Sequence, residues 1–221
     1  MSTKRGCGMF GLIGKPRSGK TTVLIDIIKG IKAKGGRVLV VDPDGAEMAW
    51  NDKQFKRYND ITMVPDNFKG VAVVMYSSKE AHGTPTFPHI QGKMDMRSNG
   101  GKRGPWSGIT IVLDDANVYA RGVLEDSLEW LCMRKRQYGA DLICTAHSWG
   151  EMSPMFLRFI DVYGIGITSG SPTERSETLK GEALKLTLKV REDVNEYKRL
   201  NPNKYPWVFI TKDGHPFTGQ L

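Results

Sequence analysis

One stretch near the start of the chain has the spacing of a phosphate-binding loop. It spans residues 14–21 and reads G-x-x-x-x-G-K-T. An apolar segment at residues 9–13 precedes it, and apolar residues with helical spacing follow it, so the motif falls in a strand–loop–helix context. Backbone N–H groups and a helix N-terminus can then hold phosphate oxygens. These flanks favour a nucleotide site over an ordinary glycine-rich turn.

Each residue type in this loop has a chemical task. Lys20 can reach the β- and γ-phosphates of ATP, and the Thr21 hydroxyl can bind Mg²⁺. The expected nucleotide contacts are Gly14, Lys15, Pro16, Arg17, Ser18, Gly19, Lys20, Thr21 and Thr22. ATP and Mg²⁺ are therefore the ligands that the loop predicts.

Two adjacent carboxylates follow a second apolar stretch. Residues 109–113 predict a buried strand, and Asp114 and Asp115 come directly after it. We expect Asp114 to hold Mg²⁺ together with Thr21, and Asp115 to orient or deprotonate the attacking water. The alternative for Asp115 is the N-cap of a following helix. A pair of acids in this position favours ATP hydrolysis.

Polar side chains also end two other predicted strands. Thr145 and His147 follow a strand at residues 141–146, where His147 can sense the γ-phosphate by hydrogen bonding or serve as a structural histidine. Asp42 and Glu47 follow another strand, and they either face the nucleotide or only shape a turn. The carboxyl ends of strands are where open α/β sheets bind ligands.

Two arginines lie near the end of a helix predicted over residues 123–137. Arg134 and Arg136 complement the helix dipole in one interpretation. In the other, one of them reaches across a subunit boundary as an arginine finger and stabilises the developing charge on the phosphate. The second interpretation makes catalysis depend on a ring of subunits.

The chain has 221 residues and a formal net charge of +8, which indicates a polyanionic partner, nucleic acid first, unless the charge serves solubility alone. Residues 77–108 form a long stretch rich in glycine, proline and basic residues, which predicts a loop that either contacts DNA or is a solvated insertion. The three cysteines lack metal-ligand spacing, and no signal peptide or membrane-spanning apolar run is evident. We therefore expect reduced thiols in the cytoplasm.

The remaining pattern predicts an α/β fold with a mostly parallel central sheet and helices on both faces. Residues 1–170 are expected to form a P-loop core, and residues 171–221 a C-terminal extension packed on the core or at a subunit interface. Strands are predicted at residues 9–13, 37–41, 71–76, 109–113, 141–146, 162–167 and 207–211. Helices are predicted at residues 20–34, 50–58, 123–137, 153–160 and 179–200.

The order of these motifs resembles the FtsK–HerA superfamily of P-loop ATPases. The resemblance rests on the loop, on the D-P-D-G-A-E run at residues 42–47, on Asp114-Asp115-Ala116, and on the segment at residues 136–147. Within that superfamily the chain is similar to the genome-packaging ATPases of tailless, membrane-containing double-stranded DNA viruses, such as tectivirus-type phages.

This resemblance implies a RecA/FtsK–HerA-like P-loop NTPase that translocates double-stranded DNA and packages a viral genome into a preformed capsid. It implies a homo-oligomeric ring, expected to be a hexamer, that meets capsid vertex proteins and works in the host cytoplasm or at the virion vertex. The family usually has Glu where this chain has Asp115, and Gln or Asn where it has His147. The matching position favours Arg136 over Arg134 as the finger.

Three other functions fit parts of the pattern. A zonula-occludens-toxin-like morphogenesis ATPase of filamentous phages shares the P-loop domain but carries a membrane-spanning segment. A small-molecule nucleotide kinase would use the segment at residues 77–108 as a lid. A nucleotide-dependent DNA-binding module would bind ATP and DNA without turnover.

Overall fold

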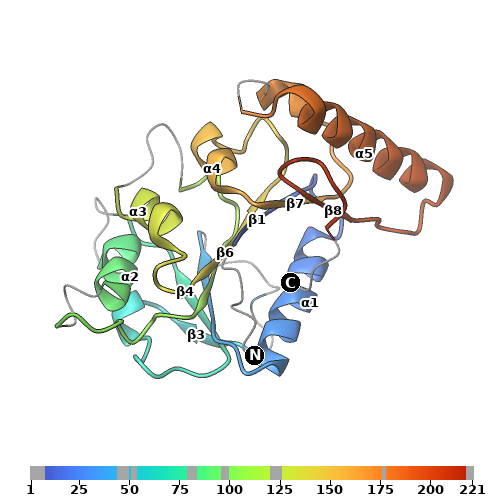
Figure 1. The fold of residues 1–221 in the computed structure, drawn as a ribbon. Coiled ribbons are helices and arrows are strands. Elements are labelled where there is room, and N and C mark those ends of the chain that lie inside the picture. The colour runs from blue at the N-terminus through green and yellow to red at the C-terminus, as the bar shows by residue number, and fades with distance from the viewer. Residues whose placement is uncertain are drawn as a thin grey trace, which may run out of the picture. The chain divides into compact units, whose positions relative to one another are not determined.

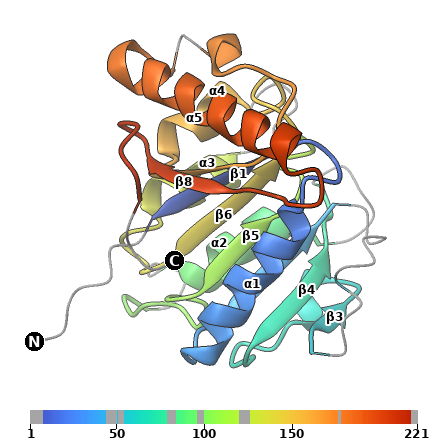
Figure 2. The same cartoon turned by 90° about the vertical axis from the view of Figure 1, so that its right-hand side faces the viewer.

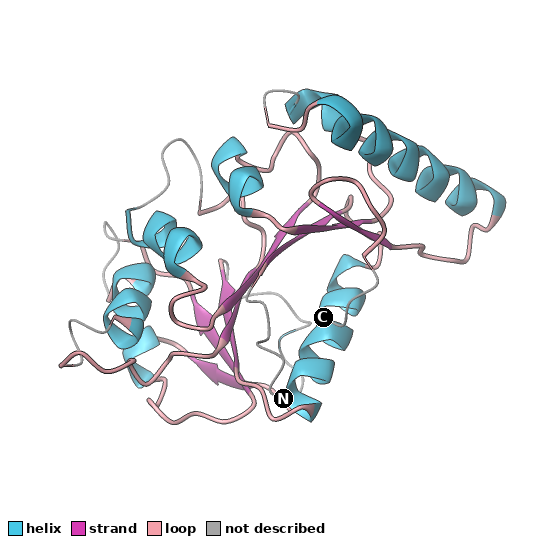
Figure 3. Ribbon diagram, viewed as in Figure 1, coloured by secondary structure: helices cyan, strands magenta, loops and turns pink. Residues whose placement is uncertain are grey.

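The structure is a computed structural model that describes residues 8–43, 50, 54–78, 84–95, 100–119, 126–175 and 178–217. Within these residues, eight strands form one sheet in the order β3-β4-β2-β5-β6-β1-β7-β8. The strands are β1 (Met9–Ile13), β2 (Val38–Asp42), β3 (Lys56–Tyr58), β4 (Val71–Met75), β5 (Thr110–Leu113), β6 (Asp141–Ala146), β7 (Val162–Ile165) and β8 (Val208–Thr211). Figure 3 distinguishes these strands from the helices and loops.

The described helices are α1 (Lys20–Ala33), α2 (Thr86–Met94), α3 (Asp126–Arg134), α4 (Pro154–Phe159) and α5 (Gly181–Leu200), with short 3₁₀ turns η2 (Ile61–Met63) and η4 (Pro172–Arg175). Among the described residues, no helix combines the length and apolar character that a membrane crossing requires. Most bounds agree with the predicted ranges to within a few residues.

The chain divides into two compact units. The first contains Met1–Gly8, Ile28–Asp114 and Leu124–Leu142, and the second contains Met9–Ile27, Asp115–Val123 and Ile143–Leu221.

The first unit is built on four parallel strands in the order β3-β4-β2-β5. Val38 lies opposite Val71 on one side and Thr110 on the other. All five residues of β2 are buried, as a central parallel strand with both faces covered requires. Helices α2 and α3 contact each other on one face of these strands, and the C-terminal half of α1 lies on the other face (Figure 1). This confirms the expected parallel strands with helices on both faces.

The second unit pairs β1 with β7 in parallel and β7 with β8 in antiparallel orientation. Phe10 lies opposite Val162, and Tyr163 lies opposite Ile210. Helix α5 packs against β7 and β8. The C-terminal part of the chain therefore supplies the strand next to β7 and the helix that packs on this pair.

Two predicted elements differ from the structure. The stretch expected as a helix at residues 50–58 contains β3 instead, whose Lys56-Arg57-Tyr58 pattern suits a partly exposed edge strand paired with β4. The stretch expected as irregular at residues 77–108 contains α2. Pro85 precedes this helix and Pro88 lies in its first turn, where a missing N–H costs no hydrogen bond. These two prolines, which suggested a loop, therefore mark the start of a helix.

Candidate nucleotide site

The predicted phosphate-binding loop connects the end of β1 to the start of α1, as expected. Its first residues are tied to two neighbouring strand ends: the Gly14 N–H donates to the Ala146 carbonyl over 3.1 Å, and the Lys15 N–H donates to the Ile167 carbonyl over 2.8 Å. Arg17 and Gly19 have positive φ angles of 63° and 80°. Left-handed residues of this kind curl a loop so that successive N–H groups face one side, which is the geometry of an anion-binding nest.

The Ser18 side chain is buried inside this loop. Its exposed fraction is 0%, and its Oγ has no hydrogen-bond partner among the described residues. A Cβ placed on Gly14 would lie 2.6 Å from this oxygen, so a larger residue at position 14 would displace the Ser18 side chain or the loop. A buried hydroxyl without a partner is costly, and a bound anion can satisfy it.

Three predicted catalytic residues of the second unit lie in a row. The Lys20 Nζ donates to the Gly14 carbonyl over 3.4 Å and to His147 Nδ1 over 2.8 Å. Because an ammonium group only donates, Nδ1 must accept, and the neutral imidazole then carries its proton on Nε2. This Nε2 lies 3.8 Å from Asp115 Oδ1. The structure therefore brings Lys20, His147 and Asp115 together, although they are far apart in the sequence.

Asp115 is held in an uncommon backbone conformation. Its φ is +52°, in the left-handed region that Asp tolerates better than most residues. The Asp115 N–H donates to Thr145 Oγ1 over 2.9 Å, and the next N–H, of Ala116, donates to the Thr145 carbonyl over 2.7 Å. Thr145 thus positions Asp115. Sequence reasoning placed Thr145 at this strand end without assigning it this contact.

The structure adds three residues that no motif indicated. Glu151 Oε2 accepts a hydrogen bond from the His147 N–H over 3.1 Å. The Trp207 Nε1–H donates to the Ser18 carbonyl over 3.1 Å, and the Tyr205 side chain lies beside Gly19. The two aromatic residues follow α5, so the C-terminal segment lies against the loop. The sequence predicted a strand at residues 207–211 but gave no sign of this contact.

The predicted Mg²⁺ ligand Asp114 belongs to the first unit. Its N–H donates to the Val41 carbonyl over 3.3 Å, and its Oδ2 accepts from Trp50 Nε1 over 3.1 Å. Asp42, at the end of the adjacent strand, is buried and lies 3.4 Å from Arg57 Nη2 in an ion pair. Glu47 lies outside the described residues.

The basic candidates also belong to the first unit. Arg134 ends α3 and donates to Gln137 Oε1 over 3.0 Å, and Arg136 lies exposed in the following turn. In the stretch at residues 77–108, Lys79 and Arg97 lie outside the described residues, whereas Lys102 and Arg103 are exposed.

Within the same stretch His89 is partly buried. Its ring packs against Trp106, with the centroids 5.6 Å apart. Burial lowers the pKa of His89, and nearby Lys93 lowers it further. The contact with Trp106 makes this histidine part of the packing of the stretch.

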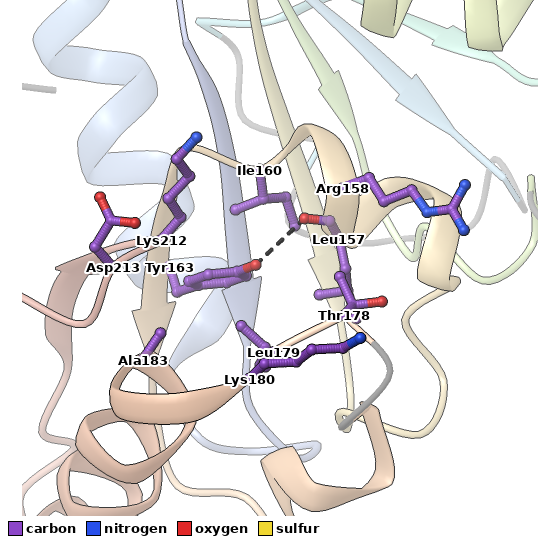
Figure 4. Close-up of a pocket in the computed structure, with 10 residues that line it drawn as sticks. All are labelled: Leu157, Arg158, Ile160, Tyr163, Thr178, Leu179, Lys180, Ala183, Lys212 and Asp213. Atoms are coloured by element: carbon purple, nitrogen blue, oxygen red, sulfur yellow. Dashed lines mark hydrogen bonds between the residues drawn. The ribbon is translucent and has the colours of Figure 1, made fainter.

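A cavity of about 420 Å³ lies elsewhere in the second unit (Figure 4). Tyr163 lines it near the start of β7, and the Tyr163 hydroxyl donates to the Leu157 carbonyl over 3.3 Å. Because β1 and β7 run parallel, the start of β7 is at the strand end opposite to the phosphate-binding loop. The charged ends of Arg158 and Lys212 point away from each other here. This cavity is separate from the candidate nucleotide site.

No protein-family model and no curated protein sequence matches the chain. Several solved structures align with the chain. The genome-packaging NTPase B204 of Sulfolobus turreted icosahedral virus 2 in complex with AMP aligns with a TM-score of 0.66 and 14% identity over 95% of this chain and 94% of that chain. The fold is that of a P-loop NTPase.

The same viral protein in complex with ATP-gammaS aligns with a TM-score of 0.61 and 14% identity over 98% of this chain and 100% of that chain. ATPases 2 and 3 of EccC from Thermomonospora curvata align with a TM-score of 0.57 and 17% identity over 98% of this chain and 38% of that chain. At these identities the likeness concerns the fold. It confirms the predicted resemblance to packaging ATPases at that level.

Proposed function

We propose that this chain is an ATP-hydrolysing motor that moves double-stranded DNA and packages a viral genome into a preformed capsid. The observation that carries the proposal is the row of Lys20, His147 and Asp115 at a phosphate-binding loop. The fold, shared with a viral packaging NTPase that has been solved with AMP and with ATP-gammaS, supports it.

In this proposal residues 14–22 hold the phosphates of ATP. When ATP binds, the Lys20 ammonium group donates to β- and γ-phosphate oxygens instead of the Gly14 carbonyl and His147 Nδ1. This exchange is possible because the carbonyl, the imidazole nitrogen and the phosphate oxygens are all hydrogen-bond acceptors. The hydroxyl of Ser18 gains a phosphate partner. His147, released from Lys20, is then able to hydrogen-bond the γ-phosphate.

Hydrolysis would be carried out by side chains that adjoin this loop and by a neighbouring copy. Asp115, fixed by Thr145, orients or deprotonates the attacking water. Arg136 of an adjacent subunit reaches the γ-phosphate and stabilises its developing charge, in keeping with its exposed position after α3. Arg136 is proposed rather than Arg134 because its position matches the family's motif.

We propose that a Mg²⁺ ion binds together with the nucleotide. Among the described residues, no cluster of three or more His, Cys, Asp or Glu could hold a metal by itself. Mg²⁺ in phosphate sites needs only one or two protein oxygens besides phosphates and waters, and the Thr21 hydroxyl and the Asp114 carboxylate supply hard oxygen ligands of this kind. Bound Mg²⁺ would neutralise phosphate charge.

Double-stranded DNA is the proposed polyanion. The net charge of +8 and the exposed Lys102 and Arg103 suit contacts to the phosphate backbone, which are independent of sequence. We further propose a homo-oligomeric ring, expected to be a hexamer, that docks on capsid vertex proteins. Its site of action would be the host cytoplasm or the virion vertex.

The test is steady-state ATP hydrolysis with and without long double-stranded DNA. We expect DNA to stimulate hydrolysis, and we expect Lys20→Ala to lower the rate by about two orders of magnitude because the cation on the phosphates is lost. Lys29→Ala, which removes an exposed lysine of the same helix, should leave the rate unchanged. Transfer of phosphate to a nucleoside monophosphate with no effect of DNA would instead establish a nucleotide kinase.

A further inference from the structure

Tyr205 is an exposed aromatic residue beside the phosphate-binding loop. The segment that joins α5 to β8 passes next to the start of α1 (Figure 2). A Cβ placed on Gly19 would lie 3.2 Å from Tyr205 Cβ and 3.5 Å from its Cγ. Nevertheless, 54% of Tyr205 is exposed. A ring in this position contacts the loop at one edge and leaves much of its surface open.

Trp207 fixes this segment to the loop. Its indole N–H donates to the Ser18 carbonyl over 3.1 Å. Its ring lies so close to Gly14 and Gly166 that a Cβ on either residue would come within 3.1 Å or less of it. This contact also holds Tyr205, two residues earlier, next to the N-terminus of helix α1.

A cation holds the Tyr205 ring from one face. The Lys198 Nζ lies 3.9 Å from the ring centroid, within the range of a cation–π contact. Lys198 also donates to the Pro202 carbonyl, which fixes its ammonium group. The ring is therefore oriented by α5 before any ligand arrives, and an oriented ring loses little entropy on binding.

We propose that Tyr205 is the platform on which the base of the nucleotide stacks, an inference that rests on the proposed function of the loop. The loop accounts for phosphates only, so the nucleoside end of a bound triphosphate extends from the start of α1. Tyr205 lies at that point. Stacking on a ring face is available to every base, and larger rings stack better. The ligand class is then nucleoside triphosphates in general, with purines preferred.

The experiment compares the binding of ATP and of inorganic tripolyphosphate, each with Mg²⁺, by calorimetry. Tripolyphosphate can use the loop but has no base. We expect Tyr205→Ala to weaken ATP and GTP binding roughly ten-fold and to leave tripolyphosphate binding within about two-fold, because stacking on an aromatic side chain contributes that much per base. Tyr205→Phe keeps the ring and should bind ATP like the unmodified protein.

Tyr197→Ala is the matched control, because it removes another exposed tyrosine from the end of α5. Thermal unfolding of each variant verifies that the fold is intact. If Tyr205→Ala weakens both ligands equally, or neither, the stacking role is overturned while the phosphate site stands. If the unmodified protein binds neither ligand, the proposed function fails and the stacking role fails with it.

Discussion

Asp115 combines a left-handed backbone with a side chain aimed at His147. A non-glycine residue with positive φ costs free energy and persists only where its surroundings fix it. Thr145 provides that fixation, because its hydroxyl accepts the Asp115 N–H and its carbonyl accepts the Ala116 N–H. The strained conformation is thus coupled to the end of β6, which also leads to His147.

Thr145→Val should separate this positioning role from simple packing. Valine has the same shape but no acceptor, so the Asp115 N–H loses its partner at a cost of about 1 kcal/mol or more. We expect a melting temperature lower by a few degrees and a larger loss in hydrolysis than in ATP affinity. Both would be measured on one preparation by calorimetry and steady-state kinetics, and Thr145→Ser should restore both.

Thr168→Val is the control for that substitution. Thr168 is also buried, but its Oγ1 has no partner among the described residues. Removing an unpaired hydroxyl is neutral or stabilising. Equal effects of the two substitutions on hydrolysis would contradict a positioning role for Thr145.

At the scale of elements, the contact between the C-terminal segment and the loop depends on glycine. A Cβ on Gly166 would lie 2.6 Å from the Trp207 ring, and a Cβ on Gly14 would lie 3.1 Å from it. The indole thus packs directly on backbone. This packing couples the position of the segment before β8 to the shape of the loop.

Gly166→Ala should therefore destabilise the protein by about 1–3 kcal/mol, the usual cost of an overpacked site. Gly30→Ala is the opposite case: it lies inside α1 with nothing within 4 Å of its would-be Cβ, so alanine should stabilise by about 0.5–1 kcal/mol. Denaturant unfolding measures both. A stabilising Gly166→Ala would show that the Trp207 ring does not occupy this place.

Some elements and contacts of this fold could be predicted from the sequence, and others could not. The loop, its flanking strand and helix, and the acid pair were recognisable because each is a local pattern of spacing and hydrophobicity. Helix α2 was not predicted because prolines such as Pro85 and Pro88 occur at the starts of helices as well as in loops. The Trp207–Ser18 bond joins residues 189 positions apart, and no local pattern records such a contact.

The row of Lys20, His147 and Asp115 could be predicted in part: the residues were candidates, but their mutual contacts were not predicted. Lys20 was a candidate by the loop motif. His147 and Asp115 were candidates by their places after predicted strands, since the carboxyl ends of neighbouring strands gather ligands. Their direct contact depends on side-chain rotamers and on the backbone twist at Asp115. These follow from packing and hydrogen bonding around β6 rather than from spacing.

At the scale of the whole molecule, the proposed motor must couple hydrolysis to movement along DNA. A net charge of +8 predicts binding to the DNA backbone that weakens steeply with salt. Salt-sensitive binding and DNA-stimulated hydrolysis are nevertheless properties that a stationary DNA-dependent ATPase also has. Movement itself distinguishes the two.

The most direct measurement is displacement of a third-strand oligonucleotide from long double-stranded DNA by the assembled protein with ATP. A translocating motor predicts ATP-dependent displacement after a lag that grows with the distance between the DNA end and the third strand, and no displacement by Lys20→Ala. DNA-stimulated hydrolysis without any displacement, at every distance tested, would contradict the proposed motor function.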